Sequence, residues 1–126
     1  MSTQAKKPKL NPADGKLAVL LPGMGAVGTT VIAGVQAVRK GVSQPIGSLS
    51  QMGRLEGMNR RSAGPLIREA LPLAQLDDLV FGGWDIFEEN CLEAARQAGV
   101  LTDDDLEAVA PELEQIEPMA AVFDPE

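Results

Sequence analysis

The chain contains no histidine and a single cysteine, Cys91, among its 126 residues. Without histidine, neither a Ser-His nor a Cys-His nucleophile pair can form, and imidazole cannot hold a metal. A lone cysteine makes no internal disulfide and no paired-cysteine zinc site, and such cysteine usage favours a reducing, cytoplasmic compartment. We therefore assign no catalytic residue and no metal ligand, and we interpret Cys91 as an ordinary helix residue.

Aromatic residues are also scarce, with three Phe, one Trp and no Tyr, although 44% of the residues are hydrophobic. The core must then consist mostly of Leu, Val, Ala and Ile, a composition that suits helices packed on a buried parallel sheet. A chain of this length accommodates one domain.

Clustered positive charge is absent as well, and the formal net charge is -7. Nucleic-acid phosphates require clustered Lys and Arg, so we expect no nucleic-acid partner. Half of the 18 acidic residues follow Leu101, in a stretch without Lys or Arg, and we interpret it as a solvated acidic surface.

Long apolar runs are missing too. No stretch approaches the roughly 20 apolar residues that cross a bilayer, so we expect no membrane span. Residues 1–14 lack the apolar core of a secretory signal and are predicted to be a disordered leader. Residues 15–126 are predicted to form one domain.

The most informative feature that is present is an apolar run, residues 17–21, leading into the sequence Gly23-Met24-Gly25-Ala26-Val27-Gly28. This pattern predicts a strand, a glycine turn and a helix. The first glycine permits the tight bend, the second lets the backbone approach a pyrophosphate, and the third lets the helix pack closely on the strand. The free N–H groups and the dipole at the start of the helix attract phosphate. Nucleotide binding is the first hypothesis.

Further elements follow along the chain. The spacing of apolar residues predicts a helix over 29–40 that ends at Gly41, and a second helix over 88–98 that ends at Gly99. Strands are predicted at 46–50 and 79–81, the latter leading into a second glycine turn at 82–86, with a loop at 51–64. Thr102 is expected to cap a short helix with Asp105, and Pro111 to limit its length. A helical turn is predicted at 66–71, and residues 119–123 are a short apolar segment.

This order predicts an α/β fold, a Rossmann-like parallel sheet with flanking helices that is incomplete, the N-terminal half of a nucleotide-binding domain. Ligands of such sheets bind at the carboxyl ends of the strands. We expect residues 23–28 at the pyrophosphate and residues 82–86 near the adenosine or the nicotinamide half.

One supporting residue is missing. An acidic residue about 20 positions after the turn usually binds a ribose hydroxyl, but that position lies near Ser48. Ser48 and Ser50 leave NAD and NADP both open, and Asp85 is a substitute carboxylate, or else a turn residue. Arg54, Arg60 and Arg61 form a solvated basic loop or reach an anion.

Residues 78–86, Asp-Leu-Val-Phe-Gly-Gly-Trp-Asp-Ile, closely resemble a motif of the inositol-phosphate synthases, NAD-dependent enzymes that make inositol phosphate from glucose 6-phosphate. Residues 17–41 resemble the nucleotide-binding turn and helix of that family, and residues 46–52 and 65–76 resemble its intervening segments. Many members carry two asparagines where this chain has Ala26 and Val27. The change preserves backbone contacts to pyrophosphate but not side-chain contacts.

The turn and the resemblance together imply an NAD site made by Gly23, Gly25, Ala26, Val27, Gly28, Thr29, Asp85 and Ile86. The implied chemistry is oxidation of the substrate by NAD, enolisation, ring closure by an aldol step and return of the hydride, a net isomerisation in inositol and phospholipid biosynthesis. In that family the catalytic lysines and the phosphate-binding residues lie in a larger C-terminal part, so no lysine here receives that role. Glucose 6-phosphate and homo-oligomer formation are expected only for the full-length enzyme.

We therefore expect an N-terminal fragment that is inactive alone and binds NAD weakly. Two other interpretations stay open: the NAD(P)-binding module of another Rossmann oxidoreductase, or a non-catalytic nucleotide-binding or regulatory module that pairs through its unfinished sheet.

Overall fold

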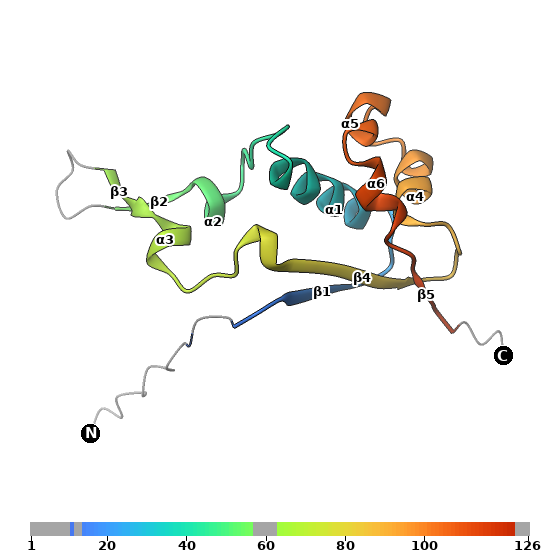
Figure 1. The fold of residues 1–126 in the computed structure, drawn as a ribbon, viewed down its shortest axis with the longest axis horizontal. Helices are drawn as coiled ribbons and strands as arrows, with labels where there is room; N and C mark the ends of the chain where they lie inside the picture. The colour runs from blue at the N-terminus through green and yellow to red at the C-terminus, as the bar shows by residue number, and fades with distance from the viewer. Residues whose placement is uncertain (1–10, 12–13, 57–62, 123–126) are drawn as a thin grey trace, which may run out of the picture.

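A three-stranded parallel sheet organises the fold of the computed structural model, which describes residues 11, 14–56 and 63–122. The sheet consists of β1 (Leu17–Pro22), β4 (Leu79–Asp85) and β5 (Met119–Ala120), in the order β1-β4-β5. All three strands run in parallel, and β4 lies in the centre (Figure 1). The predicted α/β class with a parallel sheet is confirmed.

Helix α1 (Ala26–Arg39) follows β1 through the glycine turn and returns along the sheet. Its apolar spacing predicted it, and the helix begins three residues earlier than expected. Gly41 has a φ of 72°, the left-handed conformation expected just after a helix end. The Arg39 side chain donates hydrogen bonds to the carbonyl oxygens of Leu76 and Leu79, which attaches the end of α1 to the beginning of β4.

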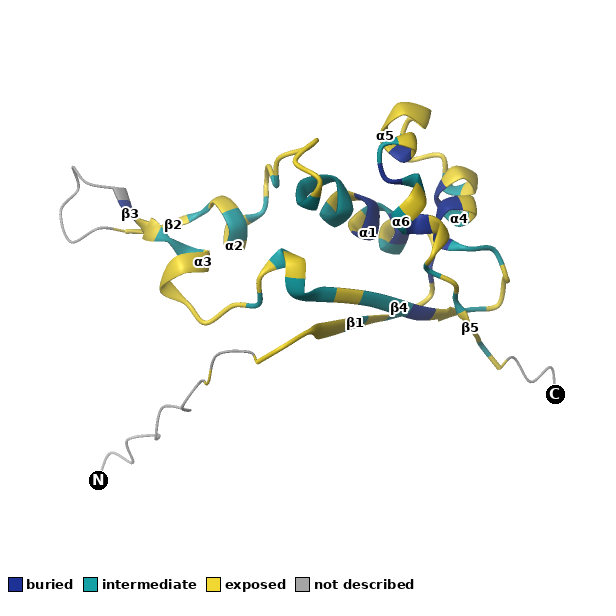
Figure 2. Cartoon of the chain, in the orientation of Figure 1, coloured by how far each residue is buried: buried dark blue, intermediate teal, exposed yellow. Residues whose placement is uncertain are grey.

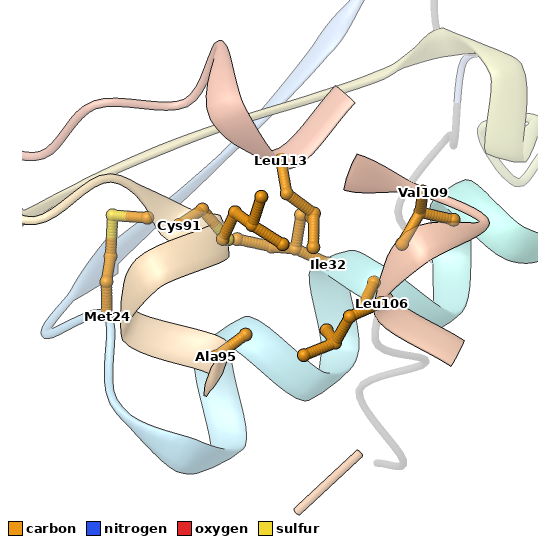
Figure 3. Packing of buried hydrophobic residues seen from close by; sticks show 9 residues of the cluster. Met24, Ile32, Cys91, Ala95, Leu106, Val109 and Leu113 are labelled. Carbon is orange, nitrogen blue, oxygen red and sulfur yellow. The ribbon is translucent and has the colours of Figure 1, made fainter. Parts of the chain in front are cut away.

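The core lies between α1 and three further helices, α4 (Cys91–Ala98), α5 (Asp103–Glu107) and α6 (Ala110–Glu114), on one side of the sheet (Figure 1). Figure 3 shows the cluster of buried side chains, with Met24 at one end and Leu106 and Val109 at the other. As the composition predicted, the buried cluster is aliphatic: Met24, Ile32, Ala33, Cys91, Leu92, Ala95, Leu106, Val109 and Leu113.

Side-chain caps fix where two of these helices begin. Asn90 and Glu93 form a reciprocal capping box, so α4 begins at Cys91 rather than at the predicted residue 88. Thr102 and Asp105 form the predicted cap of α5. Helix α5 ends at Glu107, four residues before Pro111, in agreement with the prediction that this proline limits its length. Pro111 itself lies in the first turn of α6, where its missing N–H has no intrahelical role.

The strand predicted at 46–50 is absent. Ile46 and Gly47 form a turn, and the short helix α2 (Leu49–Met52) follows. Gly47 has a φ of 84°, outside the strand region, and Ile46 is 83% exposed, so no buried face supports a strand here.

The predicted loop after it contains an antiparallel pair, β2 (Arg54–Glu56) and β3 (Ala63–Leu66). Next come α3 (Ile67–Ala70), within the predicted helical turn, and the short 3-10 helix η1 (Leu76–Asp78). This hairpin lies away from the sheet (Figure 1).

The second glycine turn, predicted at 82–86, is also wrong, because Gly82 and Gly83 continue β4 to Asp85. The absence of a side chain at Gly83 permits close contact between the strands. Gly83 is paired with Leu21 of β1, and the space beside it is occupied by the Leu21 carbonyl.

One side of the sheet is bare of helices in the described part of the chain (Figure 2). Leu20 and Val80 are 53% and 48% exposed, and Trp84 and Met119 lie on the same side of the pleat. Parallel sheets are normally covered on both faces, so this apolar face of the described sheet lacks the cover that such sheets usually have. None of the helices seen in residues 14–56 and 63–122 combines the length and apolar character needed to cross a membrane.

Candidate functional site

The candidate site lies at the carboxyl ends of β1 and β4, where the glycine turn joins α1. The turn begins at Gly23, whose φ of 122° favours glycine and whose N–H donates to the Leu21 carbonyl at 2.9 Å. Because β1 and β4 are paired in parallel up to Pro22 and Trp84, the turn and Asp85 meet at the same edge of the sheet.

Each of the three glycines of the turn has a different structural role. Gly23 is required by its backbone conformation. A Cβ on Gly28 would lie 3.2 Å from Leu21 Cδ1, so Gly28 permits close packing of α1 on β1. Gly25 has an extended conformation with a φ of -87°, and a Cβ there would meet no atom within 4 Å. Nothing in the described fold therefore requires glycine at this position. The open space beside the Gly25 backbone suits the close approach of a ligand.

The N-terminus of α1 is free to bind an anion. Gly25 is the N-cap residue, no side chain caps the helix, and the first turn contains no acidic residue. The first intrahelical bond runs from the Thr29 N–H to the Gly25 carbonyl at 3.0 Å, so the N–H groups of Ala26, Val27 and Gly28 have no partner within the helix. Unpaired N–H groups and the positive end of the dipole bind phosphate without a cationic side chain.

Thr29 supports this turn from inside the core. Its side chain is 1% exposed, and its hydroxyl donates to the Gly25 carbonyl at 2.9 Å. Both the hydroxyl and the backbone N–H of Thr29 are thus directed at Gly25, whereas Val27, two residues earlier, is 79% exposed.

Asp85 closes the other side of the site. Its Oδ2 accepts a 2.8 Å hydrogen bond from the Met24 N–H, and its Oδ1 accepts a 3.1 Å bond from the Phe87 N–H. These bonds, first from Met24 and then from Phe87, lower the pKa of Asp85 below its ordinary value. The carboxylate is therefore ionised at neutral pH. The next two side chains, Ile86 and Phe87, are 61% and 65% exposed.

An open cavity of about 280 Å³ lies between the glycine turn, the end of β4 and α4. Its walls include Met24, Gly25, Asp85, Phe87, Glu89 and Gln97. The cavity is thus continuous with the free N–H groups of α1 and has room for a group attached to a bound phosphate.

Other residues that the sequence suggested lie outside the candidate site. The Ser48 and Ser50 hydroxyls lie 3.4 Å apart, and Ser48 lines a separate groove beside α1. Arg54 donates to the Gly64 carbonyl at 3.0 Å within the β2–β3 hairpin, and Arg60 and Arg61 lie outside the described residues. Over the part of the chain that the structure describes, no group of three or more His, Cys, Asp or Glu side chains is placed to hold a metal ion.

Sequence reasoning missed two contributors to the site. Met24 was treated only as a residue between glycines, although a large apolar side chain in such a turn indicates an anchor in the core. The end of β5 was also missed. The Ala121 N–H donates to the Asp85 carbonyl at 2.9 Å, and the short apolar run after Pro118 was the only indication of this strand.

Comparison with known proteins gives consistent matches. The model of an NAD-binding domain, described as myo-inositol-1-phosphate synthase, matches residues 17–126. The chain is 49% identical over 119 residues to inositol-3-phosphate synthase 1 of Bacteroides thetaiotaomicron, a match that covers 94% of this chain and 27% of that protein. It is 36% identical to inositol-3-phosphate synthase isozyme 1 of Arabidopsis thaliana, with 88% and 24% covered.

The fold matches a crystal structure of inositol-3-phosphate synthase from Caenorhabditis elegans with a TM-score of 0.70 and 21% identity. That match covers 86% of this chain and 24% of the nematode chain. The chain thus spans about a quarter of the length of the relatives that it matches, 27% and 24% for the two curated proteins.

Proposed function

The chain belongs to the myo-inositol-1-phosphate synthase family, and from this premise we propose that it forms the NAD-binding part of an inositol-3-phosphate synthase. The match of the family's NAD-binding domain over residues 17–126 carries the proposal. The resemblance that residues 78–86 first indicated is thereby confirmed, and NAD is the cofactor of the matched domain.

The residues of the turn fit NAD. We propose that the N–H groups of Ala26, Val27 and Gly28 bind the pyrophosphate, with Gly25 leaving room for its approach. Gly23 and Thr29 shape the turn, and Asp85 lines the cavity. We propose that the exposed Ile86, directly after Asp85, also contacts the cofactor. Bound NAD supplies a reversible hydride acceptor, which suits a reaction whose net result is an isomerisation.

We propose that the activity, conversion of glucose 6-phosphate to inositol phosphate, belongs to a longer protein. The relatives are about four times as long, since the chain covers 27% and 24% of them. We assign no catalytic side chain in these 126 residues, and we expect no turnover by the chain alone. A homo-oligomeric enzyme in the cytoplasm, acting in inositol and phospholipid biosynthesis, is the physiological setting that we propose.

Titration calorimetry of the purified chain with NAD tests the cofactor assignment. We expect weak, saturable binding that Gly25→Val abolishes, because the new side chain occupies the approach to the phosphate. Circular dichroism should show an unchanged fold, since a Cβ on Gly25 meets no protein atom within 4 Å.

The matched control is Gly34→Ala within α1, where a Cβ also meets no atom within 4 Å. This variant should bind NAD like the wild type. Equal binding by Gly25→Val and the wild type contradicts the assignment of the turn, and robust turnover of glucose 6-phosphate by the chain contradicts the division of activity.

A further inference from the structure

We propose that Asp85 is a positioning residue, whose carboxylate fixes the Met24 peptide and so holds Gly25 and the first turn of α1 ready for a pyrophosphate. The inference rests on the proposed function, because it concerns the same dinucleotide site. It differs from a role in which Asp85 is a ligand of the cofactor's ribose.

The contacts of Asp85 join three separate parts of the chain. Its side chain accepts from the Met24 N–H at 2.8 Å, in the turn between β1 and α1, and from the Phe87 N–H at 3.1 Å, in the loop after β4. Its carbonyl oxygen accepts from the Ala121 N–H at 2.9 Å, at the end of β5. Both carboxylate oxygens are therefore already engaged by protein N–H groups.

Met24 is held from two sides. Its side chain is 2% exposed and lies at the edge of the core, as Figure 3 shows, and a Cβ on the neighbouring Gly83 would lie 3.2 Å from its Cγ. Its N–H is held by Asp85. The side chain thus anchors the residue in the core, and the carboxylate sets the orientation of the peptide.

The turn depends on this restraint because glycines flank Met24 on both sides. Glycine has the widest range of backbone conformations, and the N-cap Gly25 has no side chain to cap the helix. The Thr29 hydroxyl holds the Gly25 carbonyl from the helix side, whereas the peptide before Gly25 is held by Asp85. A ligand that has to order a flexible turn binds more weakly, because the turn loses conformational entropy on binding. A turn that is already fixed avoids this loss. The bond from Asp85 to Met24 supplies the fixed orientation directly before Gly25.

Charge alone predicts the opposite effect. An ionised carboxylate beside a phosphate-binding helix end repels the anion, so its removal would strengthen phosphate binding if Asp85 acted only through its charge. If Asp85 instead bound the ribose, its removal would weaken the binding of NAD but not of inorganic pyrophosphate, which has no ribose. The three roles therefore give different results with the same variants.

The experiment compares Asp85→Asn and Asp85→Ala with the wild-type chain. The matched control is Asp78→Asn, directly before β4, where the side chain is 44% exposed and its Oδ1 lies 3.7 Å from Lys16 Nζ. Two readouts are used: hydrogen exchange of the Met24 amide by NMR in the ligand-free chain, and calorimetric affinity for NAD and for inorganic pyrophosphate.

We expect the Met24 amide to exchange faster in Asp85→Ala, and affinities for NAD and pyrophosphate to fall together by about tenfold or more, as for loss of a charged hydrogen bond. Asp85→Asn keeps one acceptor oxygen and should lie between the wild type and Asp85→Ala, a partial rescue. Asp78→Asn should match the wild type in both readouts.

Tighter pyrophosphate binding by Asp85→Asn overturns the proposal in favour of a charge effect, and loss of NAD affinity alone overturns it in favour of a ribose ligand. Unchanged Met24 exchange in Asp85→Ala also overturns it. If the wild-type chain binds neither probe, the proposed function of the isolated chain is contradicted. The effect of Asp85→Ala on Met24 exchange then decides the positioning role by itself.

Discussion

Gly83 of β4 is paired with Leu21 of β1 so closely that a Cβ on Gly83 would clash with the Leu21 carbonyl oxygen. The same Cβ would lie 3.2 Å from Cγ of Met24, the residue that anchors the glycine turn. The absence of a side chain at Gly83 therefore decides both the contact between the two central strands and the position of the turn at their ends.

The neighbouring glycines of β4 give a matched test of this contact. We expect Gly83→Ala to destabilise the chain strongly, because a backbone oxygen cannot move aside for the new methyl group without separating the strands. Gly82→Ala should have a small effect, since its Cβ meets only Leu20 Cδ2, at 3.4 Å, an ordinary van der Waals distance. Thermal unfolding followed by circular dichroism measures both, and equal melting temperatures would refute the explanation.

Leucines in the core and on the bare face of the sheet should respond differently to truncation. Leu113 is fully buried between α1, α4 and α6, so Leu113→Ala should lower the free energy of unfolding by about 2 to 5 kcal/mol. Leu20 is 53% exposed on the uncovered face, so Leu20→Ala should lower it by much less. Urea denaturation gives both values. A larger loss for Leu20→Ala than for Leu113→Ala would contradict the position of the core on the helix-covered side of the sheet.

The capping box of α4 predicts a smaller, specific effect. In the structure the Asn90 side chain accepts from the Glu93 N–H at 3.0 Å, while Glu93 accepts from the Asn90 N–H at 3.1 Å. Asn90→Ala should cost about 1 kcal/mol of stability, the usual value for an N-cap residue. Asn90→Asp keeps the acceptor and is the control, expected near the wild type in the same urea titration.

Burial of Cys91 predicts a dependence of stability on alkaline pH. The thiol is fully buried, and burial raises its pKa to about 11. In the unfolded chain a cysteine thiol loses its proton near pH 8.5, roughly the ordinary value for this group. Between these pKa values the unfolded state binds fewer protons than the folded state, so the free energy of unfolding should fall as the pH rises from about 8.5 towards 11.

The variant Cys91→Ala isolates this effect from the titration of other groups. The difference in unfolding free energy between wild type and variant should be constant near pH 7 and should shrink above pH 8.5, roughly the ordinary thiol value. A difference that stays constant to pH 10 would indicate that the thiol ionises in the folded protein as it does in the unfolded chain.

Local sequence determined the parts of this protein whose physics is local. The periodicity of apolar residues predicted α1, and Gly41 and Gly99 predicted the ends of α1 and α4. Glycine marks these ends because it adopts the left-handed backbone conformation after a helix at little energetic cost. Thr102 and Asp105 predicted a cap, since both partners lie within one turn. The turn at residues 23–28 was also predicted by its pattern of glycines, together with the parallel α/β class.

Only the tertiary structure decided which distant residues meet. The glycines of β4 indicate a turn in isolation, yet Gly83 lies within a strand because the Leu21 carbonyl leaves no room for a side chain. Likewise, residues 46–50 have the composition of a strand but no sheet edge or buried face to join. The bond between Asp85 and Met24 spans 61 positions, and it depends on the parallel register of β1 and β4, which no local pattern encodes.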